Sequence, residues 1–425
     1  MFFIADLHTH SRFAGATSAT LCLETLYQWA LIKGIDVVST GDFTHPQWIK
    51  ELEEKLQPEN NGFFSLKQLP ELNVLPGIKT KGRKIYFCLS VEVSCEYVVK
   101  GIRYRTHQLI YAKNFETAHR INKMLSRYGN LAADGRPSLH LQSHELFKIV
   151  LDIPHAYFVP AHVWTPWCSS LGAVEGHNSL QDCFKDVTPE LFAVETSLSA
   201  DPLMCRRYDA LDMLTLLSNS DAHSPQNLGR EVNLLNTELC YDAMFNAFKT
   251  KNGFLGTYEY FPQKRKCYND GHRDCKVSLS IDEVSDNICP MCRQPLTIGV
   301  AHRVEQLANK NFPKAEETVQ PFQYVLPLPE IFAEIKGIKA EKPLDTKIVR
   351  DIYSKAISFF GNEFDILHHI PLEDIHRYHP TLSIAIERLR NNQKHFTAGY
   401  DGVYGSIHFF NEDELDVKQK QMALF

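Results

Sequence analysis

The chain begins Met1-Phe2-Phe3-Ile4-Ala5-Asp6-Leu7-His8-Thr9-His10, a short apolar run that ends in an acid and two histidines. A run of this kind predicts a buried β-strand. Alternate side chains of an extended strand point the same way, so the imidazoles of His8 and His10 are expected side by side. Two adjacent imidazoles can bind a metal, but an isolated pair is equally compatible with two surface histidines. The interpretation therefore depends on the rest of the chain.

Five further strand-like runs end in a residue that can ligate a metal, at 37–42 (with His45 just beyond), 85–92, 156–162, 191–195 and 214–223. His107, which precedes the strand-like run 108–111, is another candidate. Parallel α/β barrels gather their active-site residues from the ends of several strands. The sequence therefore predicts one shared site with the candidate ligands His8, His10, Asp42, His45, Glu92, His107, His162, Glu195, Asp221 and His223.

This set is larger than a single ion can use, because zinc takes about four or five ligands and harder ions take about six. We therefore expect two or three divalent metals that share bridging carboxylates. The mixture of imidazole and carboxylate suits Zn, Mn, Mg or Fe. Glu92, Asp221 and His223 are the expected catalytic residues among these ligands.

The composition is that of an ordinary globular protein, with 44% hydrophobic and 23% charged residues in 425. This length predicts two or three domains. The formal charge of −6 argues against a chain coated in basic residues, although it allows a local basic channel. There is no run long enough for a bilayer and no basic leader, so we expect a cytoplasmic protein without a membrane partner. The eleven cysteines fit that location if most are reduced.

A second metal site is indicated by cysteines and one histidine that follow a turn-rich, basic stretch at 253–266. Two tetrahedral sets are possible: His272, Cys275, Cys289 and Cys292, or Cys267 with the three other cysteines. Either suits one structural zinc, which would fold a segment too short to form its own core. Lys264, Arg265 and Arg273 beside it are candidate phosphate contacts or simply a solvated face.

Helical patterns appear around 329–336, 345–360 and 382–394, separated by proline-rich links. The expected domains are a metal-dependent barrel at 1–260, a zinc-binding segment at 261–300 and a mostly helical domain at 301–425. Trp164 and Trp167 lie in a proline-stiffened loop, where they can stack on a base or pack beneath the loop. The glycine–aromatic loop at 399–405 lacks the Lys-Ser/Thr of a phosphate-binding loop, so we assign it no nucleotide.

The ordered set of strand-end motifs resembles the polymerase and histidinol phosphatase (PHP) superfamily of metallo-phosphoesterases. The resemblance rests on His8-Thr9-His10, Thr40-Gly41-Asp42, Glu92, His162 and Asp221-Ala222-His223 and covers roughly the first 235 residues. It implies an α/β fold, a distorted seven-stranded (β/α)7 barrel. Asp42 stands where many relatives have histidine, so the choice between Asp42 and His45 as ligand is open.

Within that superfamily the chain resembles the endonuclease Q family in 40–46, 160–167, 218–225, Leu228-Gly229-Arg230-Glu231, 270–273 and 289–292. The resemblance implies a DNA repair endonuclease that nicks on the 5′ side of deaminated bases (uracil, hypoxanthine, xanthine) or abasic sites. Such an enzyme leaves 3′-hydroxyl and 5′-phosphate ends. DNA is then the partner, and the candidate DNA or base contacts are Trp164, Trp167, Arg230, Lys264, Arg265 and Arg273.

Two other classes share the metal site. A small-molecule phosphatase of the histidinol-phosphatase kind has the same cluster but no use for a zinc segment and a helical domain. A non-catalytic DNA-binding scaffold is disfavoured by the nearly complete ligand set. The sequence leaves the metals, the lesion preference, the oligomeric state and any protein partner open.

Overall fold

The computed structural model of the protein describes residues 1–284, 286–311, 320–411 and 413–415. Its α-helices are α1 Leu23–Lys33, α2 Pro46–Lys55, α3 Phe115–Leu125, α4 Ser143–Leu151, α5 Leu180–Phe184, α6 Pro202–Cys205, α7 Tyr241–Thr250, α8 Val300–Leu307, α9 Leu328–Ile335, α10 Lys347–Phe360, α11 Leu372–Tyr378 and α12 Pro380–Arg390. Its strands are β1 Phe2–Asp6, β2 Val37–Ser39, β3 Leu56–Pro58, β4 Phe64–Leu66, β5 Tyr86–Val99, β6 Ile102–Ala112, β7 Ser138–Leu139, β8 Ala156–Pro160, β9 Ala193–Glu195, β10 Thr215–Leu217, β11 Val232–Asn236, β12 Phe254–Tyr260, β13 Asp270–His272, β14 Val277–Leu279, β15 Phe322–Val325, β16 His395–Thr397 and β17 Ser406–His408.

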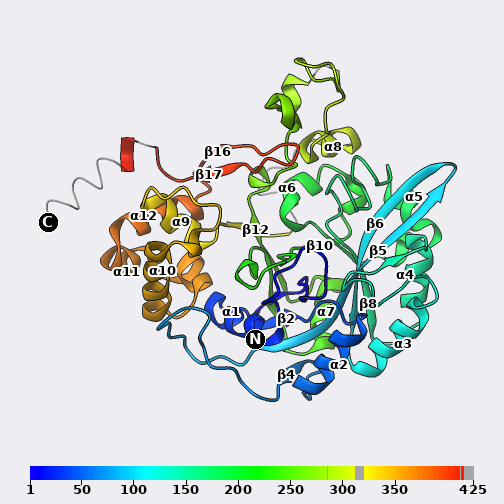
Figure 1. Ribbon diagram of the computed structural model, residues 1–425, viewed down its shortest axis with the longest axis horizontal. Helices are drawn as coiled ribbons and strands as arrows, with labels where there is room; N and C mark the ends of the chain where they lie inside the picture. The colour runs from blue at the N-terminus through cyan, green and yellow to red at the C-terminus, as the bar shows by residue number, and fades with distance from the viewer. Residues whose placement is uncertain (285, 312–319, 412, 416–425) are drawn as a thin grey trace.

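The strands form a mixed sheet with helices around it (Figure 1). The path of hydrogen-bonded neighbours is β15-β12-β11-β1-β2-β5-β4-β3, and β6 continues from β5 to β8. β1, β2 and β5 run parallel, with Ala5 opposite Val37 and Val38 opposite Phe87. Helices connect the parallel strands, as the alternating sequence pattern predicts.

The ladders do not close around the whole set of strands. β9 and β10 form a separate parallel pair, and β11 and β6 pair antiparallel with β1 and β5. The β5–β6 pair is antiparallel because the two strands are joined directly by Lys100 and Gly101 rather than by a helix. The fold is therefore mixed α/β, and the closed seven-stranded (β/α)7 barrel stays a prediction.

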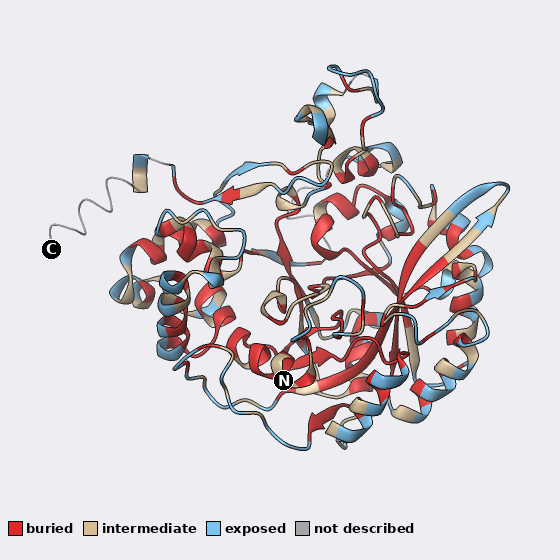
Figure 2. Cartoon of the chain, viewed as in Figure 1, coloured by how far each residue is buried: buried red, intermediate tan, exposed pale blue. Residues whose placement is uncertain are grey.

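One buried cluster nevertheless collects inward-facing side chains from eight strands. It contains Phe3, Ala5, Leu7, Val37, Cys88, Leu109, Tyr111, Val159, Ala161, Ala193, Leu217 and Leu235 from β1, β2, β5, β6, β8, β9, β10, β11 and the residues that follow them. Helix α7 fills the same interior with Tyr241, Phe245 and Phe248, which are fully buried. Figure 2 shows these central strands as the buried part of the molecule. This packed interior supports the strand ends that carry the candidate ligands.

The parts beyond residue 260 are connected to this sheet rather than separate from it. β15 pairs parallel with β12, with Thr257 opposite Phe322. Helices α9, α10 and α12 confirm the helical patterns expected at 329–336, 345–360 and 382–394, and α11 is a further helix between α10 and α12. Near 399–405 the chain returns to the start of the segment for which the sequence predicts zinc binding, where Gly399 N donates to the carbonyl of Gln263. The division at 260 and 300 stays a prediction.

Among the residues that the structure describes, no helix is both long and apolar enough to span a membrane.

Candidate metal centre

The first strand delivers its two histidines as the sequence predicts. His8 and His10 are 1% and 0% exposed, and their rings lie 5.4 Å apart. His10 Nε2 lies 3.2 Å from Asp221 Oδ1 and 3.3 Å from Glu92 Oε2. His8 Nε2 lies 3.5 Å from Asp221 and has no hydrogen-bond partner although it is buried. These four side chains could therefore hold one ion.

Glu92 connects this group to a second one. Its Oε2 faces His8 and His10, whereas its Oε1 lies 2.8 Å from both His107 Nδ1 and His162 Nε2. Glu92, His107 and His162 are all buried and form a second possible ligand set. A carboxylate that offers one oxygen to each of two sets has the geometry of a bridging ligand.

Two other predicted ligands lie behind the histidines. Asp42 accepts hydrogen bonds from His10 Nδ1 (3.1 Å), Ser11 N (2.6 Å) and Ser11 Oγ (2.7 Å). Glu195 accepts from His8 Nδ1 (2.9 Å), from Asn219 Nδ2 (2.9 Å) and from the backbone N of His162 (2.9 Å). A carboxylate on Nδ1 fixes the ring and leaves Nε2 to face the site. In this structure both acids orient the histidines and lie outside the two ligand sets.

His45 and His223 also lie outside the two sets. His45 stacks on Phe13, with ring centroids 4.4 Å apart, and is the N-cap residue directly before helix α2. His223 Nδ1 donates to the backbone O of Asp221, and its ring lies 4.6 Å from that of His10. His223 is thus a neighbour of the first set, whereas His45 is turned toward an aromatic contact.

The backbone at three of these positions is strained. Asp42, His162 and Asp221 have φ values of 53°, 30° and 45°, in the left-handed region that favours glycine. Such a conformation costs about 1–3 kcal/mol and persists only where its surroundings enforce it. Asp6 supplies one such constraint, because its buried carboxylate accepts from Ser220 N (3.1 Å) and Gly229 N (2.8 Å) on either side of Asp221. The fold therefore holds Asp221 against its own conformational preference.

The charges of the site compensate one another. Burial favours the neutral form of His8, but Glu195, Asp221 and Glu92 outweigh that effect and raise its pKa well above the usual value. Burial also opposes the ionised form of Glu92, yet His107, Arg136 and His8 hold its pKa well below the usual value. The pKa of Asp221 is likewise held well below its usual value, against the effect of burial, by His8, His223 and His10. Glu92 and Asp221 are therefore ionised, which is the form that binds a cation.

Arg136 is a site residue that sequence reasoning missed. Its Nη1 lies 3.1 Å from Glu92 Oε2, and its side chain is 26% exposed. The loop before β7 places it there, because β7 pairs with β5 two residues beyond Glu92, with Ser94 opposite Ser138. A loop arginine does not follow the strand-end pattern, so only its position between Gly135 and Pro137 hints at a fixed conformation.

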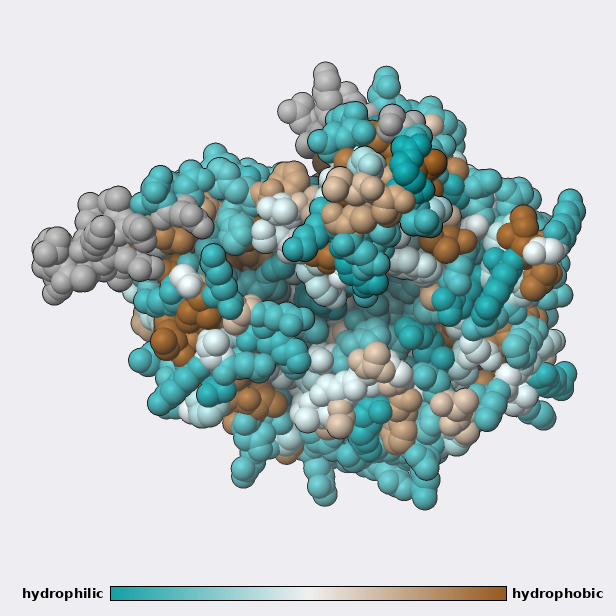
Figure 3. Space-filling view, turned by 45° about the horizontal axis from the view of Figure 1, so that its top comes forward, coloured by the Kyte–Doolittle hydropathy of each residue, from teal (hydrophilic) through white to brown (hydrophobic). Residues whose placement is uncertain are grey.

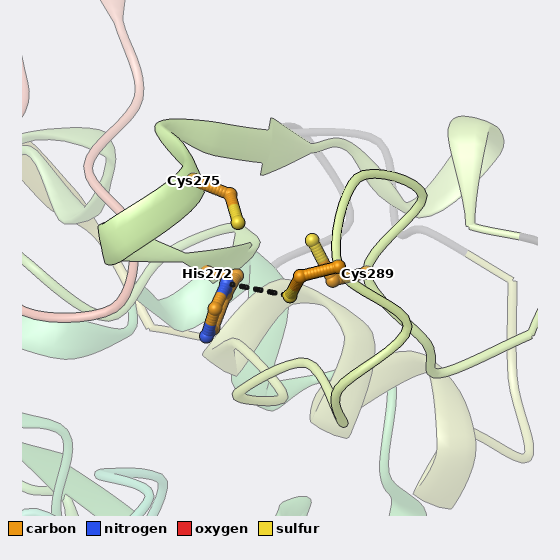
Figure 4. Close-up of side chains that lie close together, drawn as sticks. His272, Cys275 and Cys289 are labelled. Carbon is orange, nitrogen blue, oxygen red and sulfur yellow. Dashed lines mark hydrogen bonds between the residues drawn. The ribbon is translucent and has the colours of Figure 1, made fainter.

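The second predicted site also converges. Ligand atoms of His272, Cys275, Cys289 and Cys292 all lie within 4.8 Å of one another. Figure 4 shows His272, Cys275 and Cys289 pointing toward a common centre, and His272 Nδ1 lies 3.4 Å from Cys292 Sγ. Cys267 is buried elsewhere, 3.9 Å from Ser199 Oγ. The structure thus favours the set with His272 over the alternative with Cys267.

Two of the candidate base contacts are tryptophans of the loop at 160–167. Trp164 is 0% exposed and packs against Tyr208, which matches the alternative in which the ring packs beneath its loop. Trp167 is only partly buried against the core.

The basic candidate DNA contacts differ in how many contacts they make with other residues of the protein. Lys264 pairs with Glu330, and Arg230 Nη2 donates to Ser220 O at 3.0 Å. Arg265 lies 5.8 Å from the ring of the exposed Tyr404. Arg273 is fixed through its backbone N, which donates to Asp401. On the face that Figure 3 shows, the surface is hollowed near its centre and mostly hydrophilic there.

Comparison with known proteins adds relatives over the whole chain. A family model described as the MJ0043 C-terminal domain matches residues 327–393. The uncharacterized protein MJ0043 of Methanocaldococcus jannaschii is 28% identical over 258 residues, which are 58% of this chain but only 31% of that protein. The uncharacterized protein YqxK of Bacillus subtilis is 26% identical over 426 residues, which are 95% of this chain and 98% of that protein.

Two solved structures are similar over nearly the full length. One is the lesion-specific endonuclease PfuEndoQ from Pyrococcus furiosus, with a TM-score of 0.82, 26% identity and coverage of 98% of this chain and 99% of that chain. The other is endonuclease Q in complex with a 27-mer duplex substrate with an abasic lesion at the active site, with a TM-score of 0.82, 27% identity and 98% of each chain. In sequence and in fold, this chain is closely similar to endonuclease Q.

Proposed function

We propose that the protein is a metal-dependent DNA repair endonuclease that cuts a phosphodiester beside a lesion. The single observation that carries this proposal is Glu92, whose two oxygens serve two separate ligand sets in a chain similar to endonuclease Q throughout. A paired metal site is suited to phosphodiester hydrolysis. The abasic duplex in the related complex supports DNA as the substrate.

The residues fit divalent cations. His8 Nε2 is buried without a hydrogen-bond partner among the described residues, and it faces the carboxylates of Asp221 and Glu92 while Glu195 holds Nδ1. A cation at this position would give it a ligand to bind. We assign the first ion to His8, His10, Glu92 and Asp221 and the second to Glu92, His107 and His162. Bound ions would polarise the phosphate and activate water. Zn, Mn, Mg or Fe all suit this donor set.

The protein's own residues prepare this chemistry. Asp42 and Glu195 fix the imidazole tautomers, as carboxylates behind metal-binding histidines do. Arg136, the partly exposed cation at the edge of the site, binds a phosphate oxygen and offsets charge that develops on it. His223 Nδ1 is held by the backbone oxygen of Asp221, and we assign this histidine to proton transfer with a water or leaving group.

The finer substrate choice is part of the proposal. We propose nicking on the 5′ side of an abasic site or a deaminated base, with 3′-hydroxyl and 5′-phosphate ends. A deaminated base pairs weakly, so turning it out of the helix costs less than for a normal base. Because Trp164 is buried, its place in a base pocket is given up. A cytoplasmic location is proposed with this function.

Substitution of Glu92 tests the shared carboxylate. Glu92→Gln removes an ionised oxygen from both sets, so we expect both barrel ions to be depleted when metal content is measured by plasma mass spectrometry. Glu195→Gln should weaken metal affinity about 10–100-fold, as loss of a supporting carboxylate does. The control is Glu96→Gln, four residues farther along β5 and outside both ligand sets. Its metal content should match that of wild type. Full occupancy in Glu92→Gln would rule out a bridging role.

The zinc segment gives a second test. We propose that His272, Cys275, Cys289 and Cys292 hold one structural zinc. Cys289→Ser should release this zinc on a colorimetric chelator assay and make residues 268–298 sensitive to limited proteolysis, because the metal replaces a core there. Cys267→Ser is the matched control and should keep the zinc. If Cys267→Ser also loses its zinc, the alternative set of Cys267 with the three other cysteines would be favoured instead.

A nicking assay separates the enzyme classes. A duplex with one abasic site, incubated with Mn²⁺ or Mg²⁺, should be cut by wild type, and Asp221→Asn should be slower by about 100-fold or more. Asp152→Asn, outside the site, should match wild type. If the protein hydrolyses p-nitrophenyl phosphate and leaves the abasic duplex uncut, the small-molecule phosphatase would be favoured. Equal nicking by Asp221→Asn would remove the metal set from the mechanism.

A further inference from the structure

The β5–β6 hairpin extends from the metal centre to the outside of the molecule. Its ladder is continuous from Leu89 opposite Ala112 to Val99 opposite Ile102. Lys100 and Gly101 close it with φ values of 51° and 81°, the two positive values of a tight primed turn. In Figure 1 the hairpin projects beyond the neighbouring helices, and Figure 2 shows its tip as exposed.

The root of the hairpin is buttressed. Tyr97 and Tyr104 lie opposite each other, and His177 stacks on Tyr104 with ring centroids 3.9 Å apart. The hydroxyl of Tyr97 lies 2.8 Å from His177 Nε2. Arg105 Nε donates to Glu175 at 2.9 Å. These contacts hold the hairpin up to residues 97 and 104, and the six residues between them form its tip.

The tip carries apolar side chains where the protein could have placed polar ones. Val98 is 65% exposed and Ile102 is 57% exposed. Residues 97–105 also contain Lys100, Arg103 and Arg105 and no acid, in a chain with a net charge of −6. Arg103 reaches back to Glu96 at 3.1 Å. Val98 lies opposite Arg103 and Ile102 lies opposite Val99, so the two exposed apolar side chains are on opposite faces of the ribbon. Apolar side chains on both faces, with cations between them, suit a polyanion that surrounds the tip, as the walls of a DNA groove would.

One face of the hairpin joins the tip to the catalytic groups. Side chains alternate along a strand, so Glu92 and Val98 share a face of β5, and His107 and Arg103 lie on the same face of β6. Val98 is six residues from Glu92, about 20 Å at roughly 3.3 Å per residue. This equals about six base pairs of duplex, at roughly 3.4 Å each.

We propose that the tip of the β5–β6 hairpin is a duplex-binding arm that enters a DNA groove beside the lesion. The inference rests on the proposed nuclease function and deepens it. A two-stranded β-ribbon fits the major groove, which is about 12 Å wide. Lys100 and Arg103 bind the flanking phosphates, and Val98 and Ile102 contact base edges or thymine methyl groups. The arm thereby holds the duplex in register with the metal centre.

Two double variants of the full-length protein separate these contacts. Lys100→Ala with Arg103→Ala should weaken binding to an abasic duplex and reduce the slope of log K against log salt by about 1.8, since each phosphate contact contributes about 0.9. Val98→Ser with Ile102→Ser should weaken binding about tenfold with the slope unchanged, because it removes only apolar contact. Fluorescence anisotropy at several salt concentrations measures both effects.

The control is Lys347→Ala with Ile348→Ser, which removes an exposed cation and an exposed apolar side chain from α10 and should bind as wild type does. Metal content that matches wild type shows that the tip variants are folded. On duplexes with only about three base pairs on one side of the lesion, the difference in affinity between the tip variants and wild type should become smaller, because the tip then has no DNA to contact. The proposal that the tip binds duplex DNA would be overturned if wild type nicks the abasic duplex and both tip variants have the affinity and the salt dependence of wild type. Wild type that never nicks would instead overturn the proposed function.

Discussion

The structure depends on one buried carboxylate. Glu92 is 1% exposed between two fully buried valines, where an ionised acid is costly unless charges and donors surround it. His8 and His10 approach one of its oxygens, His107 and His162 approach the other, and Arg136 closes the edge. These residues come from strands or loops that are distant in sequence. The requirement to compensate Glu92 therefore brings β1, β5, β6 and the loop after β8 to a single point.

The rest of the fold keeps that point rigid. Inward-facing side chains of eight strands and the aromatic residues of α7 fill the interior beneath it. Asp42 and Glu195 hold the rings of His10 and His8, and Asp6 ties the strand end to both sides of Asp221. The left-handed backbone at Asp42, His162 and Asp221 is unfavourable by itself and persists because these contacts enforce it. Strain at the site and packing below it are thus parts of one arrangement.

The sequence predicts which side chains meet at the site better than it predicts the role of each one. His8, His10, His162 and Asp221 follow the ends of β1, β8 and β10, as the strand-end pattern predicts, and they converge with Glu92 and His107. Glu92 and His107 instead lie within β5 and β6, because these strands continue past the site as a hairpin that the sequence pattern did not reveal. Spacing does not say which oxygen or ring nitrogen faces inward, so Asp42 and Glu195 could not be told from ligands in advance. Arg136 comes from a loop that is placed only by the pairing of β7 with β5. From sequence alone, Trp164 could either stack on a base or pack beneath its loop. The hydrogen bond from Val163 N to Glu195 O holds the loop against β9, and the ring enters the core. The β5–β6 hairpin replaces a helical crossover and makes the fold mixed rather than wholly parallel.

The measurement that bears most directly on this account is anomalous diffraction at metal absorption edges, on crystals of the protein prepared without chelator. The account predicts separate peaks on the two sides of the Glu92 carboxylate, one beside His8 and His10 and the other beside His107 and His162. A single peak away from Glu92, or none near it, would contradict a shared carboxylate between two ions.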